Sequence, residues 1–185
     1  MNNKQSEKEQ LRKFYRQKRD AITEENVKRW SEAISEHIVS TELYQQAKTV
    51  YFYYPLGNEV NLLAVARKAL DAGKCVGFPK TEGDIIRFYK VESLEDFQEG
   101  CFHVMEPVST ELLDVENPLI LTPGLIFDKQ KNRMGYGKGY YDRYTAILPK
   151  AIKIGVAYEM QLTQEVPVDE YDVPMDYMIT EKGMW

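Results

Sequence analysis

One stretch, from Pro123 to Tyr144, constrains the fold more than any other part of the chain. It follows the apolar run Leu119-Ile120-Leu121, which is bounded by prolines and predicts a buried strand. A helix can begin at Tyr140, and the loop before it reads Gly135, Tyr136, Gly137, Lys138 and Gly139. Glycines admit positive φ and let backbone N–H groups approach an anion, and a helix N-terminus favours negative charge. This order of strand, glycine-rich loop and helix predicts a phosphate site in an α/β fold.

The loop is neither of two common phosphate motifs. G-x-x-x-x-G-K-[ST] is absent because a glycine follows Lys138, and the spacing G-x-G-x-G differs from G-x-G-x-x-G. A plain glycine-rich turn is the alternative interpretation. However, the segment carries Arg133 and Lys138, and the next carboxylate along the chain is Asp142. These two cations favour an anion site over a plain turn.

The same stretch resembles the signature of the 5-formyltetrahydrofolate cyclo-ligase (methenyltetrahydrofolate synthetase) family. That signature is similar to PG-x-x-FD, a short spacer and R-[LM]-G-x-G-[GK]-G-YYD. The matching residues are Pro123-Gly124, Phe127-Asp128 and the run from Arg133 to Asp142. The resemblance implies that Arg133 and Lys138 are catalytic cations and that the loop binds ATP. The implied ATP-binding residues of this loop are Arg133, Met134, Gly135, Tyr136, Gly137, Lys138, Gly139, Tyr140 and Tyr141.

The N-terminal segment carries a basic stripe. Ser6 and Glu9 fit a capping box, which predicts a helix from Ser6 to about Arg19. The helical period places on one face Lys8, Arg12, Arg16 and Arg19. Periodicity alone favours a solvated basic face. The family's first helix is similar to K-x-x-LR-x-x-x-[KR], and this resemblance implies that Lys8 and Arg12 reach the nucleotide phosphates.

Residues at the carboxyl end of an earlier predicted strand are candidates for substrate binding. Tyr54 and Glu59 follow a β-branched and aromatic strand, and ligands of open α/β sheets bind at such strand ends. A first-turn helix partner is the alternative for Glu59. The segment resembles the family's Y-x-P-x-x-x-E-[IV], which implies that Glu59 contacts the pterin of a folate. The segment from Gly100 to Pro107 resembles another family motif, which makes Phe102 a candidate to stack on an aromatic ring of the substrate. A position in the core is the alternative for Phe102. The loop residues that would also face the substrate are Tyr136, Gly137, Lys138, Gly139 and Tyr140.

The resemblance also implies a magnesium site at Asp142 and Asp172. A helix-capping role for Asp142 and a turn-forming role for Asp172 are the alternatives. Many family members carry histidine before the second aspartate, whereas this chain has Tyr171. A role for that histidine therefore cannot be transferred to this sequence.

The order of helical and strand patterns predicts one domain over residues 1–185. It is a three-layer α/β/α domain, with a mostly parallel central sheet and an N-terminal pair of helices, the second beginning after Thr23. A net charge of −5 argues against nucleic acid or an anionic membrane as a partner. Cys75 and Cys101 have no metal-ligand spacing, which favours free thiols in a reducing compartment. We expect a cytoplasmic monomer, without a signal peptide, that acts on a small molecule.

The resemblance implies an enzyme that uses ATP and Mg²⁺ to convert 5-formyltetrahydrofolate into 5,10-methenyltetrahydrofolate. The expected intermediate is an iminium phosphate, and the expected products include ADP and phosphate. One alternative is a sugar-phosphate isomerase or a CoA-transferase-like enzyme on a related scaffold, for which no acid/base or covalent glutamate can be assigned. Another is a non-catalytic paralogue that binds folate or nucleotide. The presence of Lys138 and Asp142 argues against that paralogue.

Overall fold

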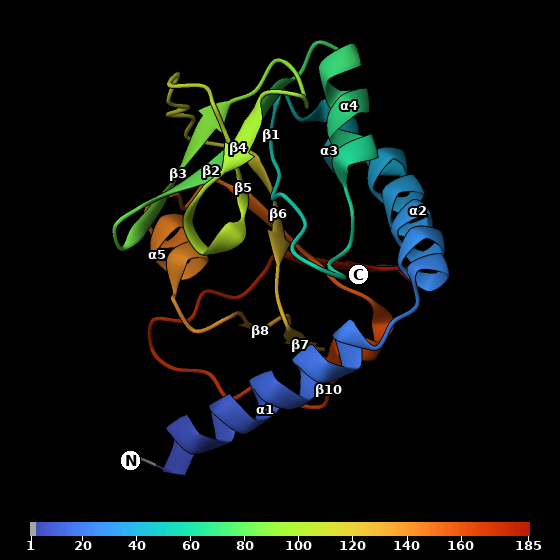
Figure 1. Ribbon diagram of the computed structural model, residues 1–185, viewed down its shortest axis with the longest axis vertical. Helices are drawn as coiled ribbons and strands as arrows, with labels where there is room; N and C mark the ends of the chain where they lie inside the picture. The colour runs from blue at the N-terminus through green and yellow to red at the C-terminus, as the bar shows by residue number, and fades with distance from the viewer. Residues whose placement is uncertain (1–2) are drawn as a thin grey trace.

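A mostly parallel sheet of seven strands forms the centre of the molecule (Figure 1). The computed structural model describes residues 3–185, apart from the side chains of Asn3, Lys4 and Phe102. The strand order is β12-β11-β9-β6-β1-β2-β3, with parallel pairing from β11 to β2 and antiparallel pairing of the two edge strands. The strands are β1 Thr49–Tyr51, β2 Cys75–Glu82, β3 Ile85–Lys90, β6 Leu119–Pro123, β9 Ile152–Val156, β11 Tyr177–Thr180 and β12 Gly183–Met184. The predicted fold class is confirmed.

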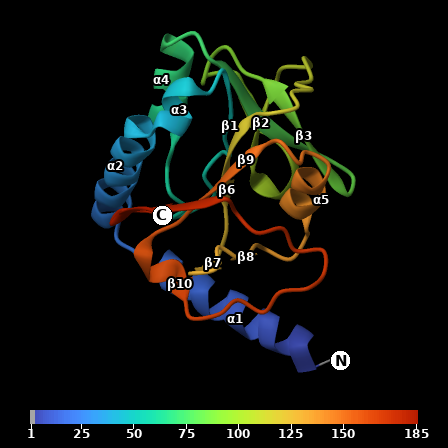
Figure 2. The same ribbon diagram turned by 180° about the vertical axis from the view of Figure 1, so that it is seen from behind.

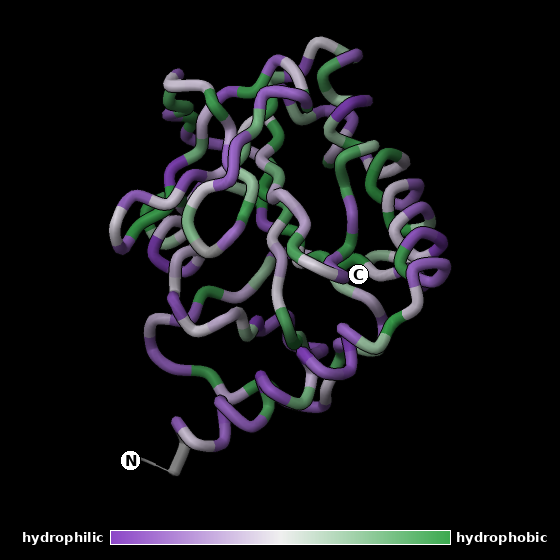
Figure 3. Tube along the Cα trace, viewed as in Figure 1, coloured by the Kyte–Doolittle hydropathy of each residue, from purple (hydrophilic) through white to green (hydrophobic). Residues whose placement is uncertain are grey.

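The central strands are apolar because both faces of the sheet are covered. Along β1, Val50 faces one buried cluster and Tyr51 faces another, and in β6 Leu119 and Ile120 alternate in the same way. Figure 3 shows hydrophobic stretches in this centre, whereas the outer helices carry many hydrophilic residues. The alternation therefore produces three layers.

Helices cover the two faces of the sheet unequally (Figures 1 and 2). One face is covered by α2 Glu24–Ser40, α3 Glu42–Gln46 and α4 Leu63–Asp71, and the other by α5 Tyr140–Ala146. The Thr23 side chain accepts a hydrogen bond from the Asn26 N–H, which confirms the predicted start of α2. Among residues 3–185, no helix is both long enough and apolar enough to cross a membrane.

The first helix, α1 Asn3–Asp20, lies apart from α2, across the lower end of the molecule in Figures 1 and 2. Its Tyr15 packs against Leu125, Met134 and Val166, beside a small sheet. That sheet consists of β10 Leu162–Thr163, β7 Ile126–Asp128 and β8 Arg133–Met134. The helix is already formed at Asn3, so the prediction that Ser6 caps it is wrong. The predicted pair of N-terminal helices is present, but α1 packs beside the small sheet whereas α2 packs on the central sheet.

Along the chain, the hairpin of β7 and β8 lies between the central strand β6 and the glycine-rich loop. Asp128 is fully buried, and its carboxylate accepts hydrogen bonds from the Asn132 N–H at 2.9 Å, the Asn132 side chain at 3.0 Å and the Val166 N–H at 2.9 Å. Asp128 therefore closes the hairpin turn and ties it to the C-terminal segment. A second hairpin consists of β4 Phe97–Glu99 and β5 Met105–Pro107, separated by the 3-10 turn Cys101–His103.

Candidate active site

A cavity of about 810 Å³ lies where β1 and β6 end, between the glycine-rich loop and α1. Its position agrees with the strand end before Tyr54 and Glu59, where a ligand was expected. The predicted site residues that line it are Arg12, Tyr54, Glu59, Arg133, Met134, Gly135, Tyr136, Gly137, Lys138, Gly139, Tyr140, Tyr141, Asp142 and Asp172. Lys8 reaches it indirectly, through an ion pair with Asp172. The side chain of Phe102 lies outside the described part of the structure, although its neighbour Cys101 is at the cavity wall.

The glycine-rich loop is bent sharply and held from two sides. Gly137 and Gly139 have φ values of +96° and +66°, which other residues rarely adopt, and Gly139 directly precedes α5. Arg12 Nε of α1 donates to the Gly135 carbonyl at 3.1 Å, and Arg143 of α5 donates to the Lys138 carbonyl at 2.7 Å. A Cβ added to Gly137 would lie 3.3 Å from Arg12 Cζ. The loop therefore lies close against the basic face of α1.

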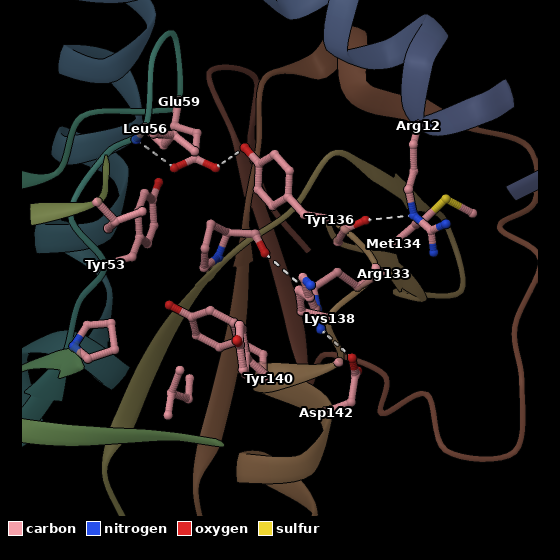
Figure 4. A pocket seen from close by; sticks show the side chains of 18 of the residues that line it. Arg12, Tyr53, Leu56, Glu59, Arg133, Met134, Tyr136, Lys138, Tyr140 and Asp142 are labelled. Atoms are coloured by element: carbon pink, nitrogen blue, oxygen red, sulfur yellow. Dashed lines mark hydrogen bonds and ion pairs between the residues drawn. The ribbon is translucent and has the colours of Figure 1, made fainter. Parts of the chain in front are cut away.

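Arg133 is held in place by a carboxylate. Its guanidinium donates to Asp142 Oδ2 at 2.8 Å and to the Pro123 carbonyl at 3.4 Å. Only 7% of Arg133 is exposed, and its Nε has no hydrogen-bond partner among the described residues. Asp142, the next carboxylate along the chain after Arg133, is thus its partner, and the two form a nearly buried pair at the cavity wall (Figure 4).

The second candidate metal ligand is paired in a similar way. Lys8 Nζ donates to Asp172 Oδ2 at 3.2 Å and to Asp169 Oδ2 at 2.6 Å. Asp142 Oδ1 accepts a hydrogen bond from the Val173 N–H at 3.2 Å, which brings the segment that carries Asp172 next to α5. Within the described residues, no group of three or more acidic, histidine or cysteine side chains is arranged around a common point.

The donor set nevertheless fits Mg²⁺ when phosphates are present. Mg²⁺ prefers oxygen ligands, keeps several waters and is commonly bound through one or two carboxylates together with substrate phosphates. Asp142 and Asp172 both line the cavity and both supply carboxylate oxygens. Each carboxylate now balances a cation that is itself suited to bind phosphate. The residues thus fit a site that is completed by a nucleotide.

Glu59 lies at the other end of the cavity and is 6% exposed. Its Oε1 accepts hydrogen bonds from the Tyr136 hydroxyl at 2.6 Å and from Arg19 NH1 at 3.2 Å, and its Oε2 accepts one from the Leu56 N–H at 2.9 Å (Figure 4). Burial raises the pKa of Glu59, and the charge of Arg19 opposes that rise. The carboxylate is thus an oriented acceptor in an apolar wall.

Two further arginines of the basic stripe on α1 also reach the cavity, and the sequence alone assigned no role to the second of them, Arg19. Arg16 and Arg19 line the cavity, and their guanidinium carbons lie 5.5 Å and 5.6 Å from the centre of the Tyr136 ring. The basic stripe had placed both on the face of Lys8 and Arg12, so the signal was present. The sequence pattern could not show which element packs against this basic face.

Known proteins similar to this chain share one description. The sequence profile of the 5-formyltetrahydrofolate cyclo-ligase family matches residues 4–181. A probable 5-formyltetrahydrofolate cyclo-ligase of Caenorhabditis elegans is 30% identical, over 94% of this chain and 92% of its own length. The NMR structure of a 5,10-methenyltetrahydrofolate synthetase from Aquifex aeolicus is 37% identical and superposes with a TM-score of 0.85, covering 96% of this chain and 91% of that one. A synthetase structure from Mycoplasma pneumoniae, 27% identical, gives a TM-score of 0.77, covering 94% of this chain and 98% of that one.

Proposed function

The chain belongs to the 5-formyltetrahydrofolate cyclo-ligase family, and we propose that it uses ATP to convert 5-formyltetrahydrofolate into 5,10-methenyltetrahydrofolate. The observation that carries the proposal is one cavity with two chemically different ends. Glu59 is a buried acceptor at one end, and Arg12, Arg133 and Lys138 supply positive charge around the glycine-rich loop. An acceptor suits the N–H edge of a pterin, and the cations suit phosphates.

The proposed reaction begins at the formyl oxygen, which is a poor leaving group. Transfer of the γ-phosphoryl group of ATP to this oxygen releases ADP and gives an iminium phosphate. N10 of the folate then attacks the iminium carbon and gives up its proton to solvent, and the C–O bond breaks with loss of phosphate as the ring system becomes methenyltetrahydrofolate. The substrate supplies both the phosphoryl acceptor and the nucleophile. The enzyme's task is therefore to position the reactants and to neutralise charge.

The residues divide this task between them. We assign Lys138 and Arg133 to the transferring phosphoryl group, and Lys8, Arg12 and the loop from Arg133 to Tyr141 to ATP. Asp142 and Asp172 would hold Mg²⁺, which when bound would neutralise phosphate charge. We assign folate to Glu59, Tyr54 and Phe102, with loop contacts from Tyr136 to Tyr140. The Tyr54 ring lies at the cavity wall, 5.0 Å from Phe97, where an aromatic ligand can pack on it. We expect residues 1–185 to act as one catalytic unit, as a cytoplasmic monomer.

Ring closure should require both ATP and a divalent metal. We expect the absorbance of methenyltetrahydrofolate to appear when 5-formyltetrahydrofolate and Mg-ATP are mixed with the protein, with ADP and phosphate formed in equal amounts. Omitting ATP, or adding a chelator, should abolish the signal. Saturable folate binding without ATP consumption would contradict the proposal and identify a non-catalytic binder.

Replacement of Glu59 should affect folate far more than nucleotide. We expect Glu59→Ala to weaken 5-formyltetrahydrofolate binding about 10- to 100-fold, the scale of lost hydrogen bonds to a charged group. ATP binding should change by less than about twofold, since charge-assisted contacts to its phosphates are made by other residues. Calorimetric titration of each ligand measures both effects, with Glu36→Ala on the exposed face of α2 as the control. Equal weakening of both ligands would show that Glu59 is structural.

A further inference from the structure

The helix α1 carries a stripe of cations, three of which line the cavity, namely Arg12, Arg16 and Arg19. Lys8 and Arg19 are separated by about 16 Å along the helix axis, at about 1.5 Å per residue. The proposed function uses the N-terminal part of this stripe for nucleotide phosphates. Arg19, at the opposite end, is 3% exposed and pairs with Glu59, so phosphate binding does not account for it.

We propose that Arg19 is a positioning residue for folate, which acts by holding Glu59 as an oriented, negatively charged acceptor for the pterin edge. This inference rests on the proposed function, because it assumes that Glu59 binds folate. It assigns to Arg19 no contact with the substrate. The effect of Arg19 on binding would pass through Glu59, with which it forms its ion pair.

The first argument is the location of the ion pair. Arg19 NH1 and Glu59 Oε1 are 3.2 Å apart, and the two side chains are 3% and 6% exposed. A carboxylate this deeply buried binds a proton readily unless a cation lies beside it. Burial raises the pKa of Glu59, and Arg19 is the cation that opposes the rise. Without Arg19, Glu59 would hold a proton to higher pH and would lose acceptor capacity.

The surroundings of Glu59 contain no second cation in contact with it among the described residues. Its other contacts are the Tyr136 hydroxyl and the Leu56 N–H. The ionisable groups that act on it from the neighbouring elements are the phenols of Tyr53, Tyr136, Tyr141 and Tyr158, in each of which burial raises the pKa. Asp20, beside Arg19, is exposed. These phenols are neutral at physiological pH, which leaves the charge balance of Glu59 to Arg19.

The second argument is that Arg19 can keep its bond when folate arrives. Tyr136 and Arg19 both donate to Oε1, and a carboxylate oxygen accepts more than one hydrogen bond. Tyr136 belongs to the glycine-rich loop, whose Gly135 and Gly137 flank it, whereas Arg19 is fixed in a helix. A pterin donor can therefore replace Tyr136 while Arg19 continues to hold the carboxylate.

Calorimetric binding of 5-formyltetrahydrofolate without ATP, between pH 6.0 and pH 8.5, tests the inference. We expect Arg19→Met to weaken binding about tenfold at pH 6.0, and the loss should shrink as pH rises because Glu59 then ionises without its partner. Arg19→Lys should stay within about threefold of the wild type, because it keeps the positive charge. Lys13→Met, an exposed lysine on the same helix, is the control and should leave binding unchanged.

A double-mutant cycle with Glu59→Gln separates positioning from other roles. In the Glu59→Gln background, Arg19→Met should have no further effect on folate binding. A pH-independent loss, or an equal loss in both backgrounds, would overturn the inference. The double variant removes both buried charges and so should fold even where Arg19→Met does not. In the wild type, NMR titration should show Glu59 ionised throughout this pH range, and a midpoint within the range would also overturn the inference.

These readouts do not depend on turnover. If folate binding depends on Arg19 but the protein forms no methenyltetrahydrofolate, the proposed function is wrong and the role of Arg19 stands. Normal turnover with folate binding insensitive to Arg19 would do the reverse.

Discussion

Lys138→Ala is expected to lower kcat at least about 100-fold while the protein folds normally. A loss of this size is typical when one preorganised contact to the transition state is removed. In the proposed reaction, charge on the transferring phosphoryl group is neutralised chiefly by cations, and Lys138 is the lysine within the glycine triplet. Steady-state kinetics with Mg-ATP and 5-formyltetrahydrofolate measure the effect.

The backbone around Lys138 explains why this one side chain should matter so much. Gly137 and Gly139, both at positive φ, flank it, and its own carbonyl accepts a hydrogen bond from Arg143 at 2.7 Å. The loop is thus anchored before a ligand arrives, which reduces the reorganisation needed to place the ammonium group. Lys138→Arg should keep part of the activity, because it keeps the charge but changes the geometry.

The matched control is Lys150→Ala, an exposed lysine whose ion pair with Glu116 is 2.6 Å long. Exposed pairs of this kind contribute little, so its rate should remain close to that of the wild type. A Lys138→Ala enzyme with near-native kcat would reduce Lys138 to a surface residue and move the catalytic charge to Arg133.

Much of the fold follows from patterns that are local in sequence. Val50 and Tyr51, and likewise Leu119 and Ile120, lie in short runs that are apolar on both faces, which is how a covered parallel strand looks. The start of α2 directly after Thr23 also depends on neighbouring residues only, and it was predicted correctly. The prediction for Ser6 failed, although its signal was of the same kind. The helix there begins earlier, so a local cap signal did not decide where it starts.

The parts of the site that the sequence did not reveal are contacts between distant segments. The hydrogen bond from Tyr136 to Glu59 joins residues 77 positions apart, and the one from Arg19 to Glu59 joins residues 40 positions apart. No periodicity or spacing encodes such a pairing. The hydrogen bond from the Val166 N–H to Asp128, which ties the β7–β8 hairpin to the C-terminal segment, likewise joins residues 38 positions apart. The residue types thus predicted which ligands the site could bind, whereas the hydrogen-bond partners of these residues depend on the tertiary structure.

Asp142→Asn is the second change with a large expected effect, because it should lower both the stability of the protein and its catalytic rate. It would leave Arg133 charged, 7% exposed and without its carboxylate partner. Removing one member of a buried pair typically costs about 3 kcal/mol or more of the free energy of unfolding. It would also remove a proposed Mg²⁺ ligand. We expect a stability loss of about 3 kcal/mol in chemical denaturation and a fall in kcat of at least about 100-fold, the scale of a lost transition-state contact.

The dependence of the rate on Mg²⁺ distinguishes metal binding by Asp142 from its pairing with Arg133. If Asp142 binds the metal, Asp142→Asn should raise the Mg²⁺ concentration needed for half-maximal rate, and excess Mg²⁺ should restore part of kcat without restoring stability. A rate loss that Mg²⁺ does not relieve would mean that Asp142 acts through Arg133 instead.

Asp172→Asn should raise the Mg²⁺ requirement with a smaller stability loss, because its Lys8 partner also pairs with Asp169. Glu170→Gln, an exposed change in the same loop, should do neither. Should Asp172→Asn leave the Mg²⁺ dependence untouched, the metal would be held by Asp142, the nucleotide phosphates and water, because these already suffice for Mg²⁺.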